Sequence, residues 1–406
     1  MKKHLKTFIF TALACTLLLG AGISAEAAEK SSKVAINDEN FAWAVKKYAK
    51  KADTNKDGYL SEKEAEKITE VRFFNAVRNI DSFKGIEYFT EIEDFYYRAD
   101  SSDTDYDDIV IHETSTASKI NLSGFKKLKK VNIDSRNAYL RKVNLKNCPN
   151  LEEVDIQGNI KGCVDDLNLK GCKNLRTLTL YMTDVKKLNL SNLKKLTELS
   201  IDDDNDKLKT LNVKGCTNLR TVDIISGSLR HLKLKGAKKL EYFSVAGACS
   251  FDSLDFSTNT GLNELHLGYG IYVSDLNLEN NLNLKKLRLY DSNITSLKVS
   301  NKNLRQLDCR ASGKLEKLDV SGCPKLEAIN CSNTDLTKLN VKKNVNLRYI
   351  DCDNTGLKKL NLKKNHTLKM LKCRDTDIRE LDLSNTRIRG PESLRYDRDV
   401  TVTYAK

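Results

Sequence analysis

One short repeated stretch constrains this chain more than any other feature. It is clearest between Leu304 and Leu383, where the leucines that begin successive repeats stand at nearly constant intervals. A fixed short period predicts a solenoid, because each unit buries its apolar side only by stacking on its neighbours. The leading leucine recurs at Leu128, Leu151, Leu175, Leu196, Leu219, Leu240, Leu262, Leu284, Leu304, Leu326, Leu347 and Leu368.

Each repeat contains two short strands. The first follows the pattern L-x-x-L-x-C or L-x-x-L-x-L, as at Leu347, Ile350 and Cys352, and a second L-x-x-L-x-L follows it. The alternation in this pattern sends the leucines inward and the residues between them outward. A weaker copy at Ile92 and Phe95 raises the prediction to about 13 coils. The predicted fold is therefore mainly β.

The pattern resembles that of leucine-rich repeat proteins over residues 83 to 390. We expect the solenoid proper at residues 119–390, after an N-terminal cap with a first worn repeat at 28–100 and an acidic insertion at 101–118. Residues 391–406 are expected to form a C-terminal cap, where Val400, Val402 and Tyr404 alternate as a capping strand.

The segment from Met1 to Ala27 is typical of a secretory signal peptide. Three lysines precede an apolar run from Phe8 to Leu19, and Ala25 and Ala27 fit a small-residue cleavage site. The alternative of a retained membrane anchor needs a longer apolar stretch. Lipid anchoring through Cys15 is a second alternative, although the residues before it match a lipoprotein cleavage site poorly.

The N-terminal cap contains an amphipathic helix, with Phe41, Ala44, Val45 and Tyr48 at helical spacing. The segment DTNKDGYLSEKE follows it and carries the EF-hand pattern, with Gly58 at the sharp turn. We expect one structural Ca²⁺ held by Asp53, Asn55, Asp57, the Tyr59 carbonyl, Ser61 and Glu64. The alternative is a capped turn without metal, because the last two of these residues also fit a helix capping box.

This cap, with the segment FKGIEYFTEIEDF after it, resembles the N-terminal cap of secreted bacterial leucine-rich repeat proteins, which are distantly similar to internalins. The resemblance implies a secreted or cell-surface binding protein and no enzymatic activity. The four histidines outside the predicted signal fall at unrelated positions of different segments: His112, His231, His266 and His366. We therefore expect no catalytic constellation.

The chain carries a net charge of +14, which falls to +12 if the predicted signal, with three lysines and one glutamate, is removed. This charge favours anionic partners such as wall polymers. The lysines do not form a stripe with interleaved aromatics, so nucleic-acid binding is not indicated. No second apolar span is present, and we expect a released or non-covalently held monomer without a transmembrane anchor.

Eleven cysteines in a secreted protein suggest disulfides, but their placement argues for free thiols. Cys309, Cys331, Cys352 and Cys373 occupy one inward position of successive coils. Neighbouring coils lie about 4.8 Å apart, which is wider than the roughly 3.8 Å between the Cβ atoms of a disulfide. A second set shares the turn before the leading leucine: Cys148, Cys172, Cys216 and Cys323.

The outward positions of the second strand are monotonous, with Lys and Asn in most coils, whereas those of the first strand vary. Repeat proteins bind through such variable sheet surfaces, and exposed tyrosines are typical anchors. The predicted ligand face consists of Tyr181, Tyr242, His266, Tyr290 and Tyr349. Tyrosine also suits a strand for reasons of packing alone.

Together these features predict a binding protein for a protein or glycan on a host cell or bacterial wall. The rival hypothesis is a basic structural protein that coats the anionic wall without a specific receptor.

Overall fold

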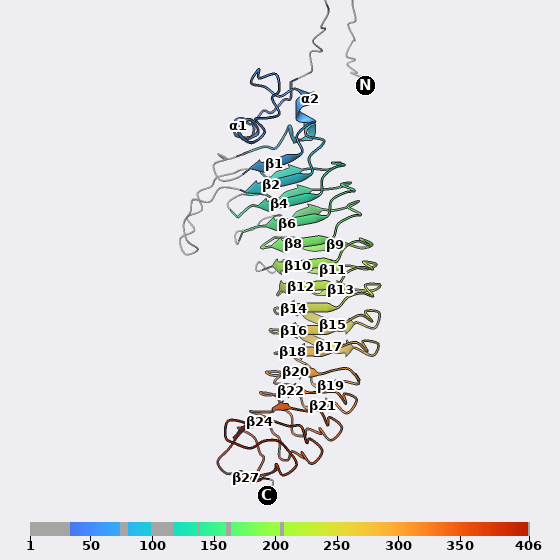
Figure 1. Ribbon diagram of the computed structural model, residues 1–406, viewed down its shortest axis with the longest axis vertical. Coiled ribbons are helices and arrows are strands. Elements are labelled where there is room, and N and C mark those ends of the chain that lie inside the picture. The colour runs from blue at the N-terminus through green and yellow to red at the C-terminus, as the bar shows by residue number, and fades with distance from the viewer. Residues whose placement is uncertain are drawn as a thin grey trace, which may run out of the picture.

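The computed structural model describes residues 33–73, 80–98, 117–136, 139–159, 164–203 and 207–404. The predicted signal peptide with Cys15, and residues 101–116 of the predicted insertion, lie outside these ranges. Stacked strands form a layered rod with the helices at its N-terminal end (Figure 1). Within the described ranges, no helix is long and apolar enough to cross a membrane.

Fifteen parallel strands form one sheet along the rod, which confirms the predicted mainly β solenoid. In spatial order they are β1 (Glu70–Phe73), β2 (Asp94–Arg98), β4 (Lys130–Asp134), β6 (Glu153–Gln157), β8 (Thr177–Tyr181), β10 (Glu198–Asp203), β12 (Thr221–Ser226), β14 (Tyr242–Ala246), β16 (Glu264–Gly268), β18 (Lys286–Leu289), β20 (Gln306–Asp308), β22 (Ala328–Asn330), β23 (Tyr349–Asp351), β24 (Met370–Cys373) and β26 (Leu394–Tyr396).

Second strands are present in most coils and form five small parallel sheets beside the large one (Figure 1). They are β3 (Lys119–Asn121), β5 (Lys142–Asn144) and β7 (Asp166–Asn168); β9 (Lys187–Asn189), β11 (Thr210–Asn212) and β13 (His231–Lys233); β15 (Ser250–Asp255) and β17 (Tyr272–Asn277); β19 (Ser296–Lys298) and β21 (Lys317–Asp319); and β25 (Glu380–Asp382) and β27 (Thr401–Thr403). The prediction of two strands in every coil is wrong for the coils that begin with β22 and β23, where residues 331–348 and 352–369 form no strand.

The apolar side chains between the two faces form one continuous core from Phe41 to Val400. All twelve leading leucines are buried, as the alternation predicts. In most coils the chain turns beside a buried asparagine or cysteine that bonds the previous coil. Asn344 Nδ2, for example, donates to the carbonyls of Val320 and Cys323 at 2.9 and 2.8 Å.

The large sheet extends beyond the predicted coils at both ends. β1 lies outside the prediction because its inward residues are Val71 and Phe73 instead of leucines. β26 also lies outside it, because Leu394 pairs with Leu371 but Pro391 takes the place of the leading leucine. The predicted C-terminal capping strand is present as β27, which pairs with β25.

The N-terminal cap contains one helix of several turns and one of a single turn. α1 (Glu39–Tyr48) begins at Asp38, whose carboxylate accepts from the Phe41 N–H at 2.8 Å. The helix that follows the predicted EF-hand loop is only one turn, α2 (Glu62–Ala65), because the chain then enters β1. A 3₁₀ turn, η1 (Ile86–Tyr88), precedes β2. Phe41 packs its ring 5.6 Å from Phe73, so α1 covers the outer edge of the sheet.

Candidate functional site

The structure brings three of the five predicted ligand-face residues onto adjacent strands. Tyr242, His266 and Tyr290 come from β14, from β16 and from directly after β18. The Tyr242 hydroxyl lies 3.4 Å from His266 Nδ1, and the two rings meet edge to face at 5.2 Å. This contact joins two coils on the outward face of the sheet.

His266 is uncharged at neutral pH. Its burial, followed by the charge of the neighbouring Arg288, lowers the pKa of His266 from 6.5. Its Nε2 atom is buried, has no hydrogen-bond partner among the described residues, and lies 3.6 Å from a Glu264 oxygen. The other oxygen of that carboxylate accepts from Lys286 Nζ at 2.8 Å. The imidazole is therefore part of this face as a neutral aromatic group.

Tyr290 packs against Tyr269, a tyrosine outside the predicted ligand face. Its ring lies 5.1 Å from the Tyr269 ring, and the Arg310 guanidinium lies 5.2 Å from the centre of the Tyr290 ring. Tyr269 is 67% exposed and occupies the turn directly after β16. A sequence signal existed: the equivalent turn position holds Asn333, Asn354 and Asp375 in later coils.

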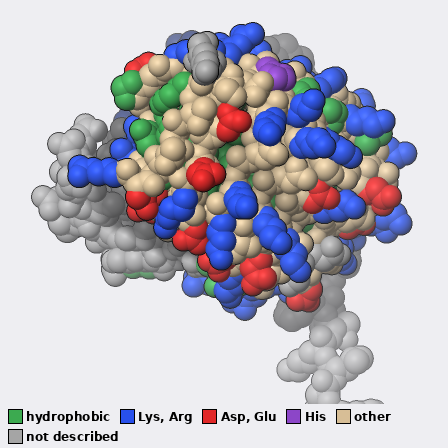
Figure 2. All heavy atoms as spheres, turned by 90° about the horizontal axis from the view of Figure 1, so that it is seen from below, with side chains coloured by type: hydrophobic (Ala, Val, Ile, Leu, Met, Phe, Trp, Pro, Cys, Tyr) green, Lys and Arg blue, Asp and Glu red, His purple; other side chains and the backbone are tan. Residues whose placement is uncertain are grey.

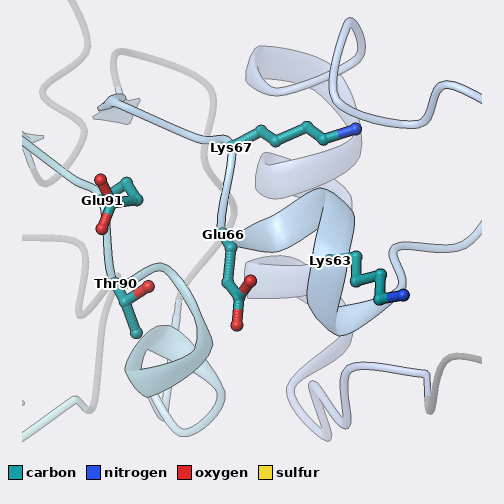
Figure 3. Close-up of a pocket in the computed structure, with 5 residues that line it drawn as sticks. All are labelled: Lys63, Glu66, Lys67, Thr90 and Glu91. Atoms are coloured by element: carbon teal, nitrogen blue, oxygen red, sulfur yellow. The ribbon is translucent and has the colours of Figure 1, made fainter.

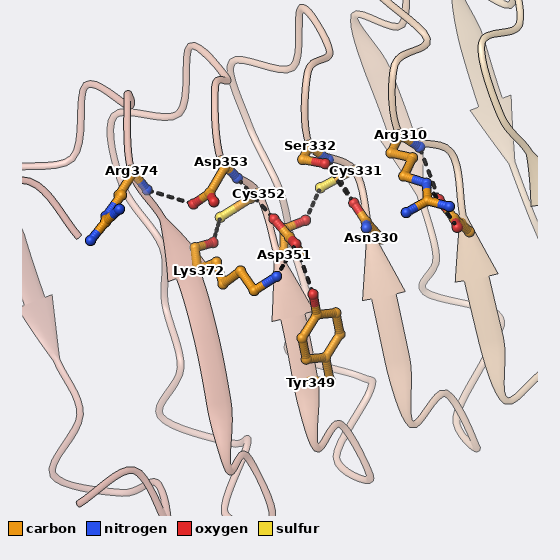
Figure 4. A network of polar contacts seen from close by, with 11 residues as sticks. Arg310, Asn330, Cys331, Ser332, Tyr349, Asp351, Cys352, Asp353, Lys372 and Arg374 are labelled. Atoms are coloured by element: carbon orange, nitrogen blue, oxygen red, sulfur yellow. Dashed lines mark hydrogen bonds and ion pairs between the residues drawn. The ribbon is translucent and has the colours of Figure 1, made fainter. Parts of the chain in front are cut away.

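The other two predicted residues lie apart from this group. Tyr181 is on β8, three strands before Tyr242, and Tyr349 is on β23 near the C-terminal end. The Tyr349 hydroxyl donates to Asp351 Oδ2 at 2.7 Å, and Lys372 Nζ donates to the same atom at 3.0 Å (Figure 4). Burial, then this bond, raises the pKa of Tyr349. Its polar end is therefore engaged within the fold.

The monotonous asparagines of the second strands have a structural role. In these coils the side-chain oxygen accepts from the backbone N–H two positions later, as from Ser191 to Asn189 at 3.2 Å and from Lys342 to Asn340 at 3.2 Å. Asn212 Nδ2 also donates to Asn189 Oδ1 in the previous coil at 2.9 Å. These amides hold the turns, so their repetition needs no ligand to explain it.

The predicted EF-hand loop is described completely, and its oxygens are bonded mainly within the loop. Asp53 Oδ2 accepts from the Gly58 N–H at 3.0 Å, and Asp57 Oδ1 accepts from the Tyr59 N–H at 2.9 Å. Asn55 Oδ1 accepts from the Asp57 N–H at 3.0 Å. The other oxygen of Asp53, Oδ1, is buried without a hydrogen-bond partner among the described residues.

Glu64 closes this loop as a capping residue. Its Oε2 accepts from the Ser61 N–H and hydroxyl at 3.0 and 2.8 Å, which completes a capping box at the start of α2. Its Oε1 accepts from the Thr54 N–H and hydroxyl, both at 2.8 Å. Within the described ranges, no three His, Cys, Asp or Glu side chains converge as metal ligands. The hard oxygen donors and the unpaired Asp53 atom fit calcium, whereas the engaged Glu64 fits the capped turn.

A shallow, open depression lies between α2 and the turn before β2. Figure 3 shows its lining residues, which are Lys63, Glu66, Lys67, Thr90 and Glu91. The side chains are mostly charged and flexible, without the apolar walls of a small-molecule site. We assign no role to it.

Nine cysteines lie in the described part of the chain, all are buried, and no disulfide joins any two of them. Instead of pairing, they donate to carbonyls of neighbouring coils, as from Cys352 Sγ to Lys372 O at 3.2 Å (Figure 4) and from Cys172 Sγ to Leu145 O at 3.0 Å. Burial raises the pKa of Cys172 to about 12 and that of Cys331 to about 12. These thiols are packing groups and not nucleophiles at neutral pH.

Comparisons with known proteins find only distant structural similarity. No protein-family profile and no curated protein matches the sequence. Among solved structures, the functional domain of InlJ from Listeria monocytogenes, which includes a cysteine ladder, has a TM-score of 0.49 and 19% identity, over 86% of this chain and 76% of that one. A leucine-rich repeat protein from Leptospira interrogans gives 0.44 and 13%, over 84% and 97%. The internalin InlF from Listeria monocytogenes gives 0.39 and 14%, over 90% and 94%.

Proposed function

We propose that this chain is a secreted or cell-surface leucine-rich repeat module that binds a protein or glycan through the outward face of its large sheet. The observation that carries the proposal is the aromatic group on β14 to β18, where Tyr242 meets His266 and Tyr290 meets Tyr269. Amphipathic aromatic side chains on a rigid, continuous sheet are typical binding anchors. In the described chain we find no group of side chains arranged for catalysis, so the proposal is a binding role.

Wall coating is the second candidate, and the net charge of +14 favours it. Seen from the C-terminal end, Lys and Arg side chains are spread over the surface with acidic side chains among them (Figure 2). Such a surface attracts a polyanion without a defined docking site.

Binding of the labelled full chain to bacterial walls and to host cells, measured over a salt series, separates the two candidates. Coating should collapse at about 0.5 M salt, where the screening length is about 4 Å. A docked aromatic face should persist, and a Tyr242→Ala and Tyr290→Ala double variant should lose binding at both low and high salt. The matched control is Lys338→Ala with Lys359→Ala, and equal losses from both pairs would favour coating.

We also propose that the loop from Asp53 to Glu64 binds one structural Ca²⁺ in the N-terminal cap. The unpaired Asp53 Oδ1 and the hard oxygens around it support this proposal. An affinity on the order of 10⁻⁴ to 10⁻³ M would suffice outside a cell. Melting curves in calcium and in chelator test it. If the natural chain melts at the same temperature in calcium and in chelator, or if Asp53→Asn keeps the calcium response, the loop is a capped turn without metal.

A further inference from the structure

Three successive coils carry a surface without formal charge in a chain that is 31% charged. Residues 224–229, 242–251 and 265–274 contain no Lys, Arg, Asp or Glu. The coils stack through β12, β14 and β16, with Ile225 opposite Ala246 and Ala246 opposite Gly268. Uncharged segments of successive coils therefore meet in one place.

Part of this surface, together with Tyr290 of the next coil, forms an apolar strip, which we define as Ile225, Ala246, Gly268, Tyr269 and Tyr290. Ile225 is 46% exposed at one end, and the two tyrosine rings stand 5.1 Å apart at the other. Between them Ala246 and Gly268 present almost no side chain. A Cβ atom at Gly268 would lie 3.7 Å from the Tyr290 Cβ, so this glycine lies directly against the tyrosine.

Tyr269 has a backbone conformation that is unfavourable for tyrosine. Its φ is +60°, in the left-handed region that glycine, asparagine and aspartate tolerate best. The equivalent turn position holds Gly247, Asp291 and Asn333 in other coils, and Met182 and Ala311 also occur there. Tyr269 combines this conformation with 67% exposure, so burial does not offset the strain. A strained and exposed aromatic residue indicates a role in binding.

The charges around the strip identify its occupant. Arg288 and Asp223 flank it on the sheet, and Asp291 follows Tyr290 in the turn. Arg310, which packs on Tyr290, is paired with Asp308 at 3.4 Å. A polyanion would meet carboxylates as well as guanidinium groups, so neither sign of charge dominates the rim. A protein surface with an apolar side chain and charges of both signs complements both the strip and its rim.

We propose that the apolar strip is the anchor point for a protein partner, which places an aliphatic or aromatic side chain over Ala246 and Gly268 against Tyr269. The inference rests on the proposed binding function and narrows its ligand to a protein. Stable interfaces involve about 20–30 residues on each side. The strip is therefore the centre of a wider contact, and the mixed charges form its rim.

The test is a random dodecapeptide library displayed on phage and selected on the immobilised full chain. Enriched peptides are synthesised, and their Kd is measured in about 0.15 and about 0.5 M salt, which differ in screening length. We expect apolar residues beside charged ones, and a Kd at least tenfold weaker for Tyr269→Asn and for Ala246→Lys. Tyr404→Asn, which changes an exposed tyrosine far from the strip, should leave Kd unchanged. Tyr269→Asn should melt at the same or a higher temperature, because asparagine suits this φ.

Several results would overturn the inference. Peptides that bind Tyr269→Asn as well as the natural chain, or that are purely acidic and are lost at the higher salt concentration, would exclude the strip as a protein anchor. A self-association that Tyr269→Asn abolishes would make a second copy the occupant. If no peptide is enriched, the strip has no such role, while the cell-binding experiment still judges the proposed function. If peptide binding depends on Tyr242 but not on Tyr269, the proposed binding function stands and the strip is not the anchor point.

Discussion

At the scale of single residues, Glu64 determines how the N-terminal cap responds to acid. Its carboxylate accepts from the backbone of both Thr54 and Ser61, which lie near the two ends of the predicted calcium loop. These bonds, led by the one from the Ser61 N–H, lower the pKa of Glu64 from 4.5 to about 2. The folded chain therefore holds a proton at this site less tightly than the unfolded chain does.

This difference predicts a stability change in acid. A lowered pKa in the folded state contributes stability that is present above pH 4.5 and is lost as the pH falls toward about 2. Melting temperatures of the natural chain and of Glu64→Gln, measured across this window in chelator, should converge as the pH falls. Two parallel curves would show that the Glu64 charge does not stabilise the cap.

At the scale of one coil, a single position before the leading leucine accepts either cysteine or asparagine. Cys323 donates one bond, from Sγ to Val299 O at 3.3 Å. Asn344, one coil later, donates two, to carbonyls at 2.9 and 2.8 Å. Both side chains are fully buried. Both residue types therefore bond carbonyls of the previous coil, cysteine with one hydrogen bond and asparagine with two.

Substitutions at Asn344 should follow this count of donors. Asn344→Ala removes two hydrogen bonds from carbonyls that each keep one backbone N–H donor, and it should lower the free energy of unfolding by about 1–3 kcal/mol. Asn344→Cys should cost less, because its thiol can reproduce the bond made by Cys323. Denaturant unfolding measures both variants. Equal losses would mean that the amide acts through its shape and not through its hydrogen bonds.

The buried thiols give a second prediction at this scale. Burial raises the pKa of Cys216 to about 11 and that of Cys373 to about 12, so the thiolate is scarce at neutral pH. A thiol reagent should react slowly with the native chain and should titrate the nine described cysteines after denaturation without reductant. Fewer reactive thiols after denaturation would reveal disulfides and contradict the prediction that cysteines in successive coils stay unpaired.

At the scale of the whole molecule, the two ends of the rod are covered differently. At the N-terminal end, α1 packs on β1 through the aromatic contact of Phe41 with Phe73. At the other end, β26 is the last strand of the large sheet, and within the described residues no further element pairs with it. Each coil of a solenoid is stabilised only by its neighbours, so an end coil has half the support of a central one.

Hydrogen exchange should report this asymmetry. We expect the amides of β26 and β27 to exchange faster than those of β14 and β16, because opening the last coil breaks only one interface. Exchange is measured on the full chain by mass spectrometry after proteolysis. Equal protection along the rod would show that the solenoid opens as a single cooperative unit.

The sequence predicts the repeated part of this fold well, because buried leucines at a fixed period permit one kind of stacking. It predicts the ends less well, since Val71 and Leu394 join the sheet in coils that have no leading leucine. For the candidate site, alternation places tyrosines on the outward face but does not say which of their side chains contact each other. The pairing of Tyr269 with Tyr290 depends on a left-handed turn, which periodicity does not detect.

The parallel register of the large sheet also bears on how quickly the chain can fold. Ile329 pairs with Ile350, its counterpart in the very next coil, and the neighbouring strands follow the same rule. Loops as short as one coil close at small entropic cost, and contacts between near neighbours in sequence are typical of fast-folding helical proteins. Although nearly all of its regular structure is strand, this protein should begin folding at any well-matched pair of coils and extend from there in both directions.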